Sequence, residues 1–214
     1  MIITILTDSD KSWFLPYGNE LLKDLEKFGH VVNYVHNSKD VIAGDICFLL
    51  SCTKLVTENT LLLNKNNIVV HASDLPKGKG FSPLQWQILE GKDEICLTLF
   101  EVVKDVDAGP FYLKANLQFK GYELYEELRD MLAKKIISMC LEYVYKRGFL
   151  SPVEQVGSES FYKRRTDIDD EIDVNKTINE LFNHFRIADN VNHPLYFWIK
   201  GKKYYIRIQA DAEM

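Results

Sequence analysis

The sequence has few cysteines and no long apolar run, and both absences limit what kind of protein it can be. Its four cysteines form no CxxC pair, and no cysteine and histidine have the spacing of zinc ligands. No apolar run approaches the roughly 18 residues needed to cross a bilayer, and the short apolar start of the chain is expected to be a strand and not a signal peptide. We therefore expect buried free thiols in a reducing cytosol, no metal site and no membrane contact.

Positive charge is also scarce. The 214 residues carry 26 basic and 31 acidic side chains, for a net charge of −5, which argues against a general nucleic-acid binder. Hydrophobic residues make up 46% of the chain and charged residues 27%, which excludes a disordered chain, a collagen-like repeat and a coiled-coil rod.

Strand and helix signals alternate over residues 1–150. The short β-branched runs predict strands over residues 2–7, 31–35, 46–50, 68–70, 95–103 and 111–117. Helical spacing of apolar residues predicts helices over residues 19–28, 57–63, 82–91 and 123–146. This alternation is typical of a doubly wound α/β domain, in which the strand over 111–117 pairs antiparallel with its predecessor.

Residues 151–214 have a different pattern of charged and apolar residues and are expected to form a small appendix. A charged connection over 158–174 precedes an amphipathic helix near 178–187 and a hairpin over 195–199 and 203–208. The apolar strands of this hairpin could pair between two copies in a homodimer, or pack on their own domain.

Two titratable residues follow predicted strands. His71 ends the strand over 68–70, and Asp107 lies in the turn after the strand over 95–103. Ligands of open parallel sheets bind beyond the carboxyl ends of the strands, so the two groups can meet in a crevice. Spacing alone leaves a second interpretation open, in which His71 caps a strand and Asp107 makes a turn with Gly109.

The loop after His71 holds two lysines and two glycines, Lys77-Gly78-Lys79-Gly80, and opens onto a helix that begins with Ser82-Pro83. Helix amides attract anions, but the P-loop pattern is absent. A solvated turn is the alternative.

Taken together, these motifs resemble the folate-dependent formyltransferases. The matching positions are His71-Ala72-Ser73, Leu75-Pro76, Gly80, Pro83, Gly91, Thr98 and Asp107-Ala108-Gly109-Pro110. The resemblance implies a Rossmann-like domain that transfers a formyl group from 10-formyltetrahydrofolate to a primary amine. His71 would then donate a hydrogen bond to the tetrahedral oxyanion, and Asp107 would take the amine proton or orient His71 and a bridging water.

The same resemblance implies where the folate binds, between the segment after the strand over 46–50 and the turn that ends at Asp107. The residues implied are Ser51, Cys52, Thr53, Leu55, Val103 and Asp105. Leu55, Leu62 and Val103 either line an apolar pocket for the folate or belong to the core.

One position departs from the family. Most members carry an asparagine two residues before the histidine as a second oxyanion donor, and this chain has Val69 there. Loss of one such donor costs roughly 10²–10³ in rate. Another group could replace it, and the candidates are Ser51, Ser73, Asp74 and Lys77.

The loop sequence is similar to a branch that formylates the amine of a nucleotide-linked amino sugar, with a UDP-4-amino-4,6-dideoxy sugar as our prediction. The diphosphate needs cations, and the sugar needs an aromatic or polar clamp. The expected substrate-binding residues are Ser12, Trp13, Lys77, Gly78, Lys79, Arg164 and Arg165. Alternatively, Arg164 and Arg165 belong to a solvated charge run, and Trp13 is an aromatic at the rim of the core.

Other acceptors fit less well. A glycinamide ribonucleotide enzyme would need a phosphate turn after the first strand, where this chain has Asp8-Ser9-Asp10. A methionyl-tRNA enzyme would need a larger C-terminal domain and a basic surface. An aminoacyl group on a carrier protein, or a non-catalytic relative that binds folate or a nucleotide, are the alternatives kept open.

Overall fold

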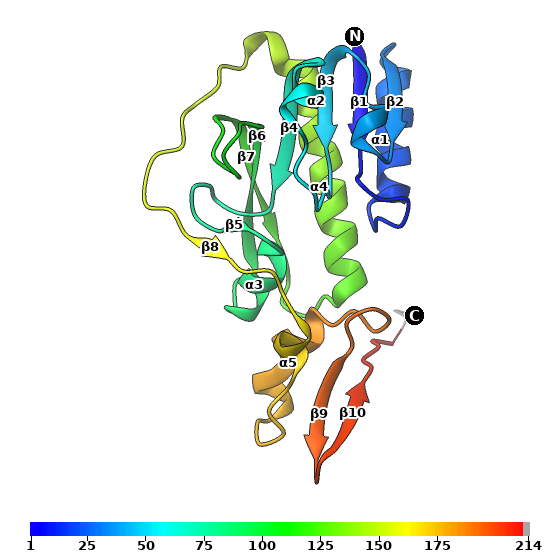
Figure 1. Cartoon of the computed structure of the whole chain (residues 1–214). Coiled ribbons are helices and arrows are strands. Elements are labelled where there is room, and N and C mark those ends of the chain that lie inside the picture. The colour runs from blue at the N-terminus through cyan, green and yellow to red at the C-terminus, as the bar shows by residue number, and fades with distance from the viewer. Residues whose placement is uncertain (212–214) are drawn as a thin grey trace.

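The computed structural model describes residues 1–211 and shows a twisted sheet covered by helices, with a small appendix below it (Figure 1). The sheet has the strand order β2-β1-β3-β4-β6-β7. Strands β1 to β4 run parallel, whereas β6 is antiparallel to both β4 and β7. The strands are β1 (Ile2–Leu6), β2 (Val31–Val35), β3 (Gly44–Leu49), β4 (Asn64–His71), β6 (Glu94–Glu101) and β7 (Phe111–Gln118). The predicted Rossmann-like fold and the antiparallel pairing of β7 with its predecessor are confirmed, whereas the reversal of β6 relative to β4 was not predicted.

Four helices belong to this domain: α1 (Leu15–Lys27), α2 (Glu58–Leu61), α3 (Pro83–Leu89) and α4 (Tyr125–Lys146). The longest, α4, has Glu126 and Glu127 in its first turn and Lys146 in its last, which suits the helix dipole. The Glu127 carboxylate also accepts a hydrogen bond from the backbone amide of Leu124, at 2.8 Å, and so satisfies one exposed donor at the helix start.

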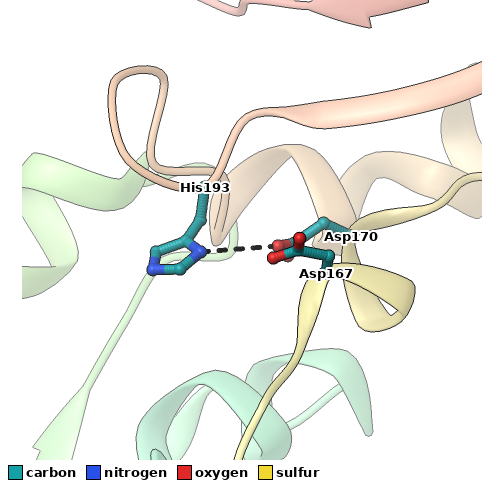
Figure 2. A group of neighbouring side chains, drawn as sticks. All are labelled: Asp167, Asp170 and His193. Carbon is teal, nitrogen blue, oxygen red and sulfur yellow. Dashed lines mark ion pairs between the residues drawn. The ribbon is translucent and has the colours of Figure 1, made fainter. Parts of the chain in front are cut away.

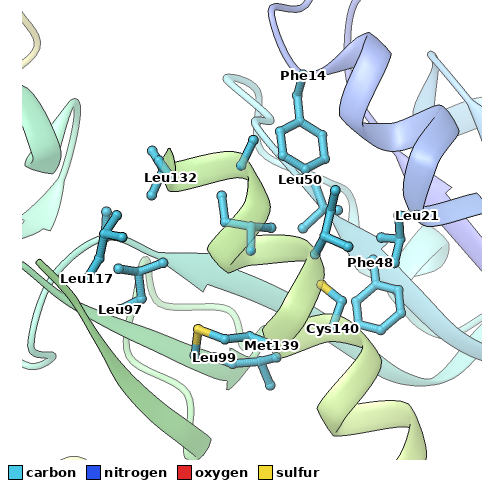
Figure 3. Packing of buried hydrophobic residues seen from close by; sticks show 14 of the residues in the cluster. Phe14, Leu21, Phe48, Leu50, Leu97, Leu99, Leu117, Leu132, Met139 and Cys140 are labelled. Carbon is cyan, nitrogen blue, oxygen red and sulfur yellow. The ribbon is translucent and has the colours of Figure 1, made fainter. Parts of the chain in front are cut away.

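The main core lies where α1 and α4 pack on one face of the sheet (Figure 3). Leu21 of α1 and Met139 and Cys140 of α4 meet Phe48 and Leu99 of the sheet, and all are at most 1% exposed. Burial of this apolar surface is what holds the sheet and its helices together. The four cysteines are free, as expected, and Cys47 and Cys140 are buried.

The two largest differences from the predicted boundaries, at the starts of α1 and β4, have physical reasons. Helix α1 begins at Leu15, four residues before the expected start, because Pro16 suits the first turn of a helix. Strand β4 begins at Asn64, before the β-branched run, since its asparagines find partners: Asn64 donates to the Ile42 carbonyl at 3.1 Å and Asn67 to the Leu61 carbonyl at 2.9 Å.

A long connection leaves α4, passes around the outside of the sheet and returns near α3 (Figure 1). In it, β8 (Phe161–Tyr162) pairs in parallel with β5 (Lys79–Gly80) from the loop after His71. Gly80 has φ +96°, and a Cβ there would lie 2.5 Å from the Tyr162 carbonyl oxygen, so only glycine fits. Short 3₁₀ turns occur at Ser38–Asp40, Arg147–Phe149 and Asp167–Asp170.

The appendix contains α5 (Ile178–Arg186) and a hairpin of β9 (Leu195–Ile199) and β10 (Lys202–Ile206). It has an apolar cluster of its own, which includes Leu181, Phe185 and Leu195. The predicted domain boundary near Leu150 and the homodimer remain predictions. Within the described residues, no helix has the length and apolarity to span a membrane.

Candidate active site

Strand β4 carries His71 to its carboxyl end, next to Thr98 of the antiparallel β6. Because side chains alternate along a strand, Asn67, Val69 and His71 share one face of the sheet. The His71 side chain is 9% exposed, so it is held within the protein and not on a solvated rim.

The imidazole is fixed by the loop that follows it. His71 Nε2 lies 2.8 Å from the carbonyl oxygen of Gly78. A carbonyl only accepts hydrogen bonds, so this contact requires a proton on Nε2. A substrate oxyanion would therefore have to take the place of the Gly78 carbonyl as the acceptor.

Asp107 lies in the turn after β6 and faces the same loop. Its backbone adopts φ +51°, and its Oδ2 accepts a hydrogen bond from the Gly80 amide at 2.8 Å. The same oxygen lies 3.9 Å from His71 Nε2, which is close enough for charge attraction and too long for a hydrogen bond. The structure thus brings together the two residues that the sequence singled out.

The loop that follows His71 is anchored to neighbouring elements and is not a solvated turn. The Thr98 hydroxyl donates to the Ser73 carbonyl at 2.7 Å, and the Gln87 amide donates to the Ala72 carbonyl at 2.7 Å. These bonds come from β6 and α3, so the two elements set the path of the backbone directly after His71.

Within the described residues, no neighbouring asparagine takes the place of the oxyanion donor that the resemblance implies at position 69. Val69 packs beside the small apolar cluster that includes Leu6 and Leu49. The Asn66 amide donates to Glu101 at 2.9 Å, and the Asn67 amide is bound to the Leu61 carbonyl. Among the described side chains of β4, the amides of Asn66 and Asn67 are thus bound to other partners, and His71 is the donor that lies at the carboxyl end of the strand.

The residues named as substitutes have different surroundings. The Ser73 hydroxyl is buried and has no hydrogen-bond partner among the described residues. Asp74 pairs with Lys114 at 2.5 Å, whereas Ser51 lies at φ +57° in the loop after β3 and Lys77 is exposed. No described hydrogen bond links any of these four residues to His71.

The predicted folate segment is shaped by Asp8, whose carboxylate accepts hydrogen bonds from the backbone amides of Thr53 and Lys54 at 2.5 and 2.6 Å. Burial raises the pKa of the Cys52 thiol to about 12, which keeps it neutral. Leu55 and Leu62 are 83% and 77% exposed, and Val103 and Asp105 are also exposed. The interpretation of Leu55, Leu62 and Val103 as core is therefore wrong, and their apolar surface is free to meet a ligand.

A cavity of about 460 Å³ lies beside this segment, at the carboxyl ends of β1 and β2. Its lining includes Asp8, Asp10, Asp40 and Lys54. The sequence offered a signal for it, the two aspartates directly after the first strand, but the contribution of β2 depends on strand order. Its excess of carboxylates makes this cavity a poor place for a phosphate.

The predicted phosphate-binding cations fall into two groups. Lys79 is 3% exposed and pairs with Glu159 at 2.5 Å, and Arg165 pairs with the buried Asp170. Lys77 and Arg164 are exposed, with the Arg164 guanidinium 4.3 Å from the centre of the Phe81 ring. Only the second group has charge available to a ligand without breaking an ion pair.

Ser12 and Trp13 lie just before α1. The Ser12 hydroxyl accepts a hydrogen bond from the Phe14 amide at 3.3 Å, and the Trp13 ring packs edge-on against Phe14 and Tyr17. The Arg129 guanidinium covers that indole at 5.2 Å. Both residues thus help to shape the start of α1, and their role toward a substrate remains a prediction.

One group with metal-ligating side chains lies in the appendix: Asp167, Asp170 and His193 (Figure 2). His193 Nδ1 lies 3.8 Å from Asp170, whose other oxygen is bound by Arg165. Since the guanidinium already balances the buried carboxylate, the group is an ion-pair cluster that joins the connection to the hairpin.

Three residues that frame the site from the connection after α4 were not predicted. Gln155 donates to the carbonyls of Asp107 and Gly109, Ser160 accepts from the Gly78 amide, and Glu159 pairs with Lys79. They are polar residues in an irregular segment. Only the fold reveals that this segment contacts both the loop after His71 and the turn that carries Asp107.

The sequence profile of the formyl transferase family matches residues 23–142. A methionyl-tRNA formyltransferase of Streptococcus agalactiae is 33% identical over 122 residues, which cover 56% of this chain and 39% of that protein. The chain thus spans well under half the length of this curated relative.

Solved structures at lower identity share the fold. A methionyl-tRNA formyltransferase from Clostridium thermocellum is 22% identical with a TM-score of 0.78, covering 96% of this chain and 97% of that one. A sugar N-formyltransferase from a Shewanella species is 11% identical, with a TM-score of 0.74. The match covers 100% of this chain and 99% of that one. HypX from Aquifex aeolicus, in complex with tetrahydrofolic acid, is 14% identical, with a TM-score of 0.78. The match covers 96% of this chain and 37% of that one. Because the family profile covers more than half of the sequence, including His71 and Asp107, the chain belongs to the formyl transferase family.

Proposed function

We propose that this protein transfers the formyl group of 10-formyltetrahydrofolate to a primary amine. The observation that carries the proposal is the His71–Asp107 pair, 3.9 Å apart at the carboxyl end of β4 and tied to one loop by Gly78 and Gly80. The family profile spans this pair, and HypX, which shares the fold, has been solved with tetrahydrofolic acid.

The chemistry assigned to the pair is acyl transfer. The amine attacks the formyl carbon, the bond from that carbon to the folate nitrogen breaks, and the proton that the amine loses is delivered to the leaving folate nitrogen. His71 Nε2–H meets the negative charge that develops on the formyl oxygen. Asp107 has one oxygen on the Gly80 amide and a second oxygen for the amine proton.

For the acceptor we propose a nucleotide-linked amino sugar. Sugar N-formyltransferases share the fold over their whole length, and Lys77 and Arg164 are exposed cations near the loop and β8 that suit a diphosphate. The C. thermocellum methionyl-tRNA enzyme matches this chain in length, so length does not separate the two classes of acceptor. The net charge of −5 and the acidic cavity beside Lys54 favour a small acceptor over tRNA.

The roles of the pair are tested by His71→Ala and Asp107→Asn, measured for formyl transfer to whichever amine the parent accepts. Each change should abolish turnover, because each removes a group that touches the reacting atoms, while the thermal midpoint stays close to that of the parent. His30→Ala, at the opposite end of the sheet, is the matched control and should keep full activity. Turnover retained in either site variant would contradict its assigned role.

The acceptor class is tested by Lys77→Ala and Arg164→Ala. Each should raise KM for a nucleotide sugar and leave KM for the folate unchanged, since only the diphosphate needs these charges. An unchanged KM for the sugar in both variants would show that the diphosphate binds elsewhere.

A further inference from the structure

We propose that Gln155 is a positioning residue that holds the Asp107 carboxylate in place beside His71. The proposal rests on the function proposed above, because it gives Gln155 a purpose only if Asp107 acts in the reaction. Gln155 lies in the irregular connection after α4, about fifty residues along the chain from the turn that it contacts.

The turn that carries Asp107 needs outside support. Asp107 sits at φ +51°, a conformation that costs a non-glycine residue energy. Two residues later, a Cβ on Gly109 would lie 1.7 Å from the Glu101 carbonyl oxygen, so the turn passes directly against the end of β6. A strained turn of this kind keeps one shape only where neighbouring groups hold it.

Gln155 supplies that support through both hydrogens of its amide. Nε2 donates to the Asp107 carbonyl at 3.0 Å and to the Gly109 carbonyl at 2.7 Å, and so bridges the two ends of the turn. The side chain is itself placed by its own backbone, because Val153, two residues earlier, exchanges two hydrogen bonds of 2.9 Å with Phe111 at the start of β7. The donor is therefore fixed to the same hairpin that contains the turn.

The same connection also holds the half of the site that belongs to His71. The Gly78 amide donates to the Ser160 hydroxyl at 2.9 Å, and the Lys79 amide donates to the Ser160 carbonyl at 2.9 Å. Gly78 is the residue whose carbonyl accepts from His71, and Gly80 is the residue whose amide binds Asp107. One segment thus contacts both loops: Gln155 binds the turn that carries Asp107, and Ser160 binds the loop that follows His71.

The bonds of Gln155 serve geometry more than stability. Its Oε1 is buried without a hydrogen-bond partner among the described residues, which offsets part of what the two donated bonds contribute to folding. Removal of the amide should therefore leave a folded protein in which the Asp107 carboxylate is free to move away from Gly80 and His71.

Gln155→Met tests this directly, because methionine has a similar length, no charge and no donor. We expect kcat to fall by about 10²-fold, the effect of a displacement of roughly 1 Å, with little change in KM for either substrate. Gln118→Met is the matched control, since the Gln118 amide also donates to two backbone carbonyls, those of Asp93 and Phe119, at the far end of β7. The control should keep the kcat of the parent.

A second readout does not depend on activity. The Gly80 amide donates to the Asp107 carboxylate, so its proton resonance and its hydrogen exchange report the placement of that group. In Gln155→Met the resonance should shift and the exchange should accelerate, and in Gln118→Met neither should change. An unchanged Gly80 amide in Gln155→Met overturns the positioning role, even if the parent proves inactive and the proposed function fails. A shifted amide with an unchanged kcat in an active protein overturns its importance for the reaction.

Discussion

Val69 lies on the same face of β4 as His71, at the position where the resemblance to the formyltransferases implies an asparagine. The structure shows it packed beside Leu6 and Leu49, with no neighbouring asparagine turned toward His71. In the proposed mechanism, His71 is therefore the single donor that the described part of this strand offers to the oxyanion. The sequence could identify this deficit, because it depends on one residue at a fixed offset from His71.

Val69→Asn should raise kcat, because it adds a second donor to the oxyanion. The upper limit is the roughly 10²–10³-fold effect that removal of one such donor has in other enzymes. The variant should also unfold at a lower denaturant concentration, since it places an amide next to apolar side chains. Single-turnover rates and urea unfolding measure the two effects, and an unchanged rate would show that another group already supplies the donor.

Contacts between residues that are distant in the chain could not be predicted from the sequence. Lys79 belongs to a loop that reads as exposed, yet its ammonium is buried against Glu159, eighty residues along the chain. The sequence left Leu55 as either a pocket residue or a core residue, and it is 83% exposed. Burial of a side chain depends on which segment covers it, and only the fold determines that.

The paired strands β5 and β8 are the element that joins the connection to the active-site loop. Each has two residues, too short for any pattern to reveal, and the pairing depends on the close approach of Gly80 to Tyr162. By contrast, α4 was predictable to within two residues, because its charged ends and its spacing are properties of a local sequence.

Gly80→Ala should separate the two strands and destabilise the protein. The new Cβ would lie 2.5 Å from the Tyr162 carbonyl, and the backbone at φ +96° is strained for alanine. Gly91→Ala is the matched control, because Gly91 has φ +82° but no atom within 4 Å of the added Cβ. We expect the control to lose about 1–2 kcal/mol of unfolding free energy from backbone strain alone, and Gly80→Ala to lose more. Equal losses in urea unfolding would contradict the close approach.

Helix α5 is fixed to the main domain by a buried arginine. Arg186 is 1% exposed and reaches Asp93 at 2.8 Å and Glu123, just before α4, at 3.3 Å. Burial raises the pKa of Glu123, but hydrogen bonds from the backbone amides of Lys120 and Gly121 and the Arg186 charge outweigh it, so the pKa lies below its ordinary value of 4.5.

This lowered pKa predicts an acid-sensitive junction. A carboxyl whose folded pKa is depressed contributes stability above its unfolded pKa and loses it as the pH falls through the folded value. The unfolding free energy should therefore decline as the pH drops below about 4.5, and Glu123→Gln should show a shallower decline over that range. Parallel pH profiles for the parent and Glu123→Gln, from urea unfolding, would contradict this account.

For the molecule as a whole, the alternation of strands and helices was enough to predict an α/β sheet, the antiparallel pairing of its last two strands and the position of His71 at a strand end. It did not reveal that β6 runs antiparallel to β4. The path of residues 150–163 around the sheet was not predictable, because it has no period and its contacts lie far away in the chain. The residues that we propose to act chemically were thus visible in the sequence, and those that we propose to hold them in place were not.

The central claim is that the whole molecule moves a formyl group from a folate to an amine. The measurement that tests it most directly is the product mass after incubation with 10-formyltetrahydrofolate and a panel of UDP- and dTDP-linked amino sugars, methionyl-tRNA and an aminoacylated carrier protein. We predict the mass gain of one formyl group on a nucleotide-linked amino sugar, absent with His71→Ala. No gain on any amine, despite measurable binding of the folate, would contradict the claim and leave a protein that holds the cofactor without using it.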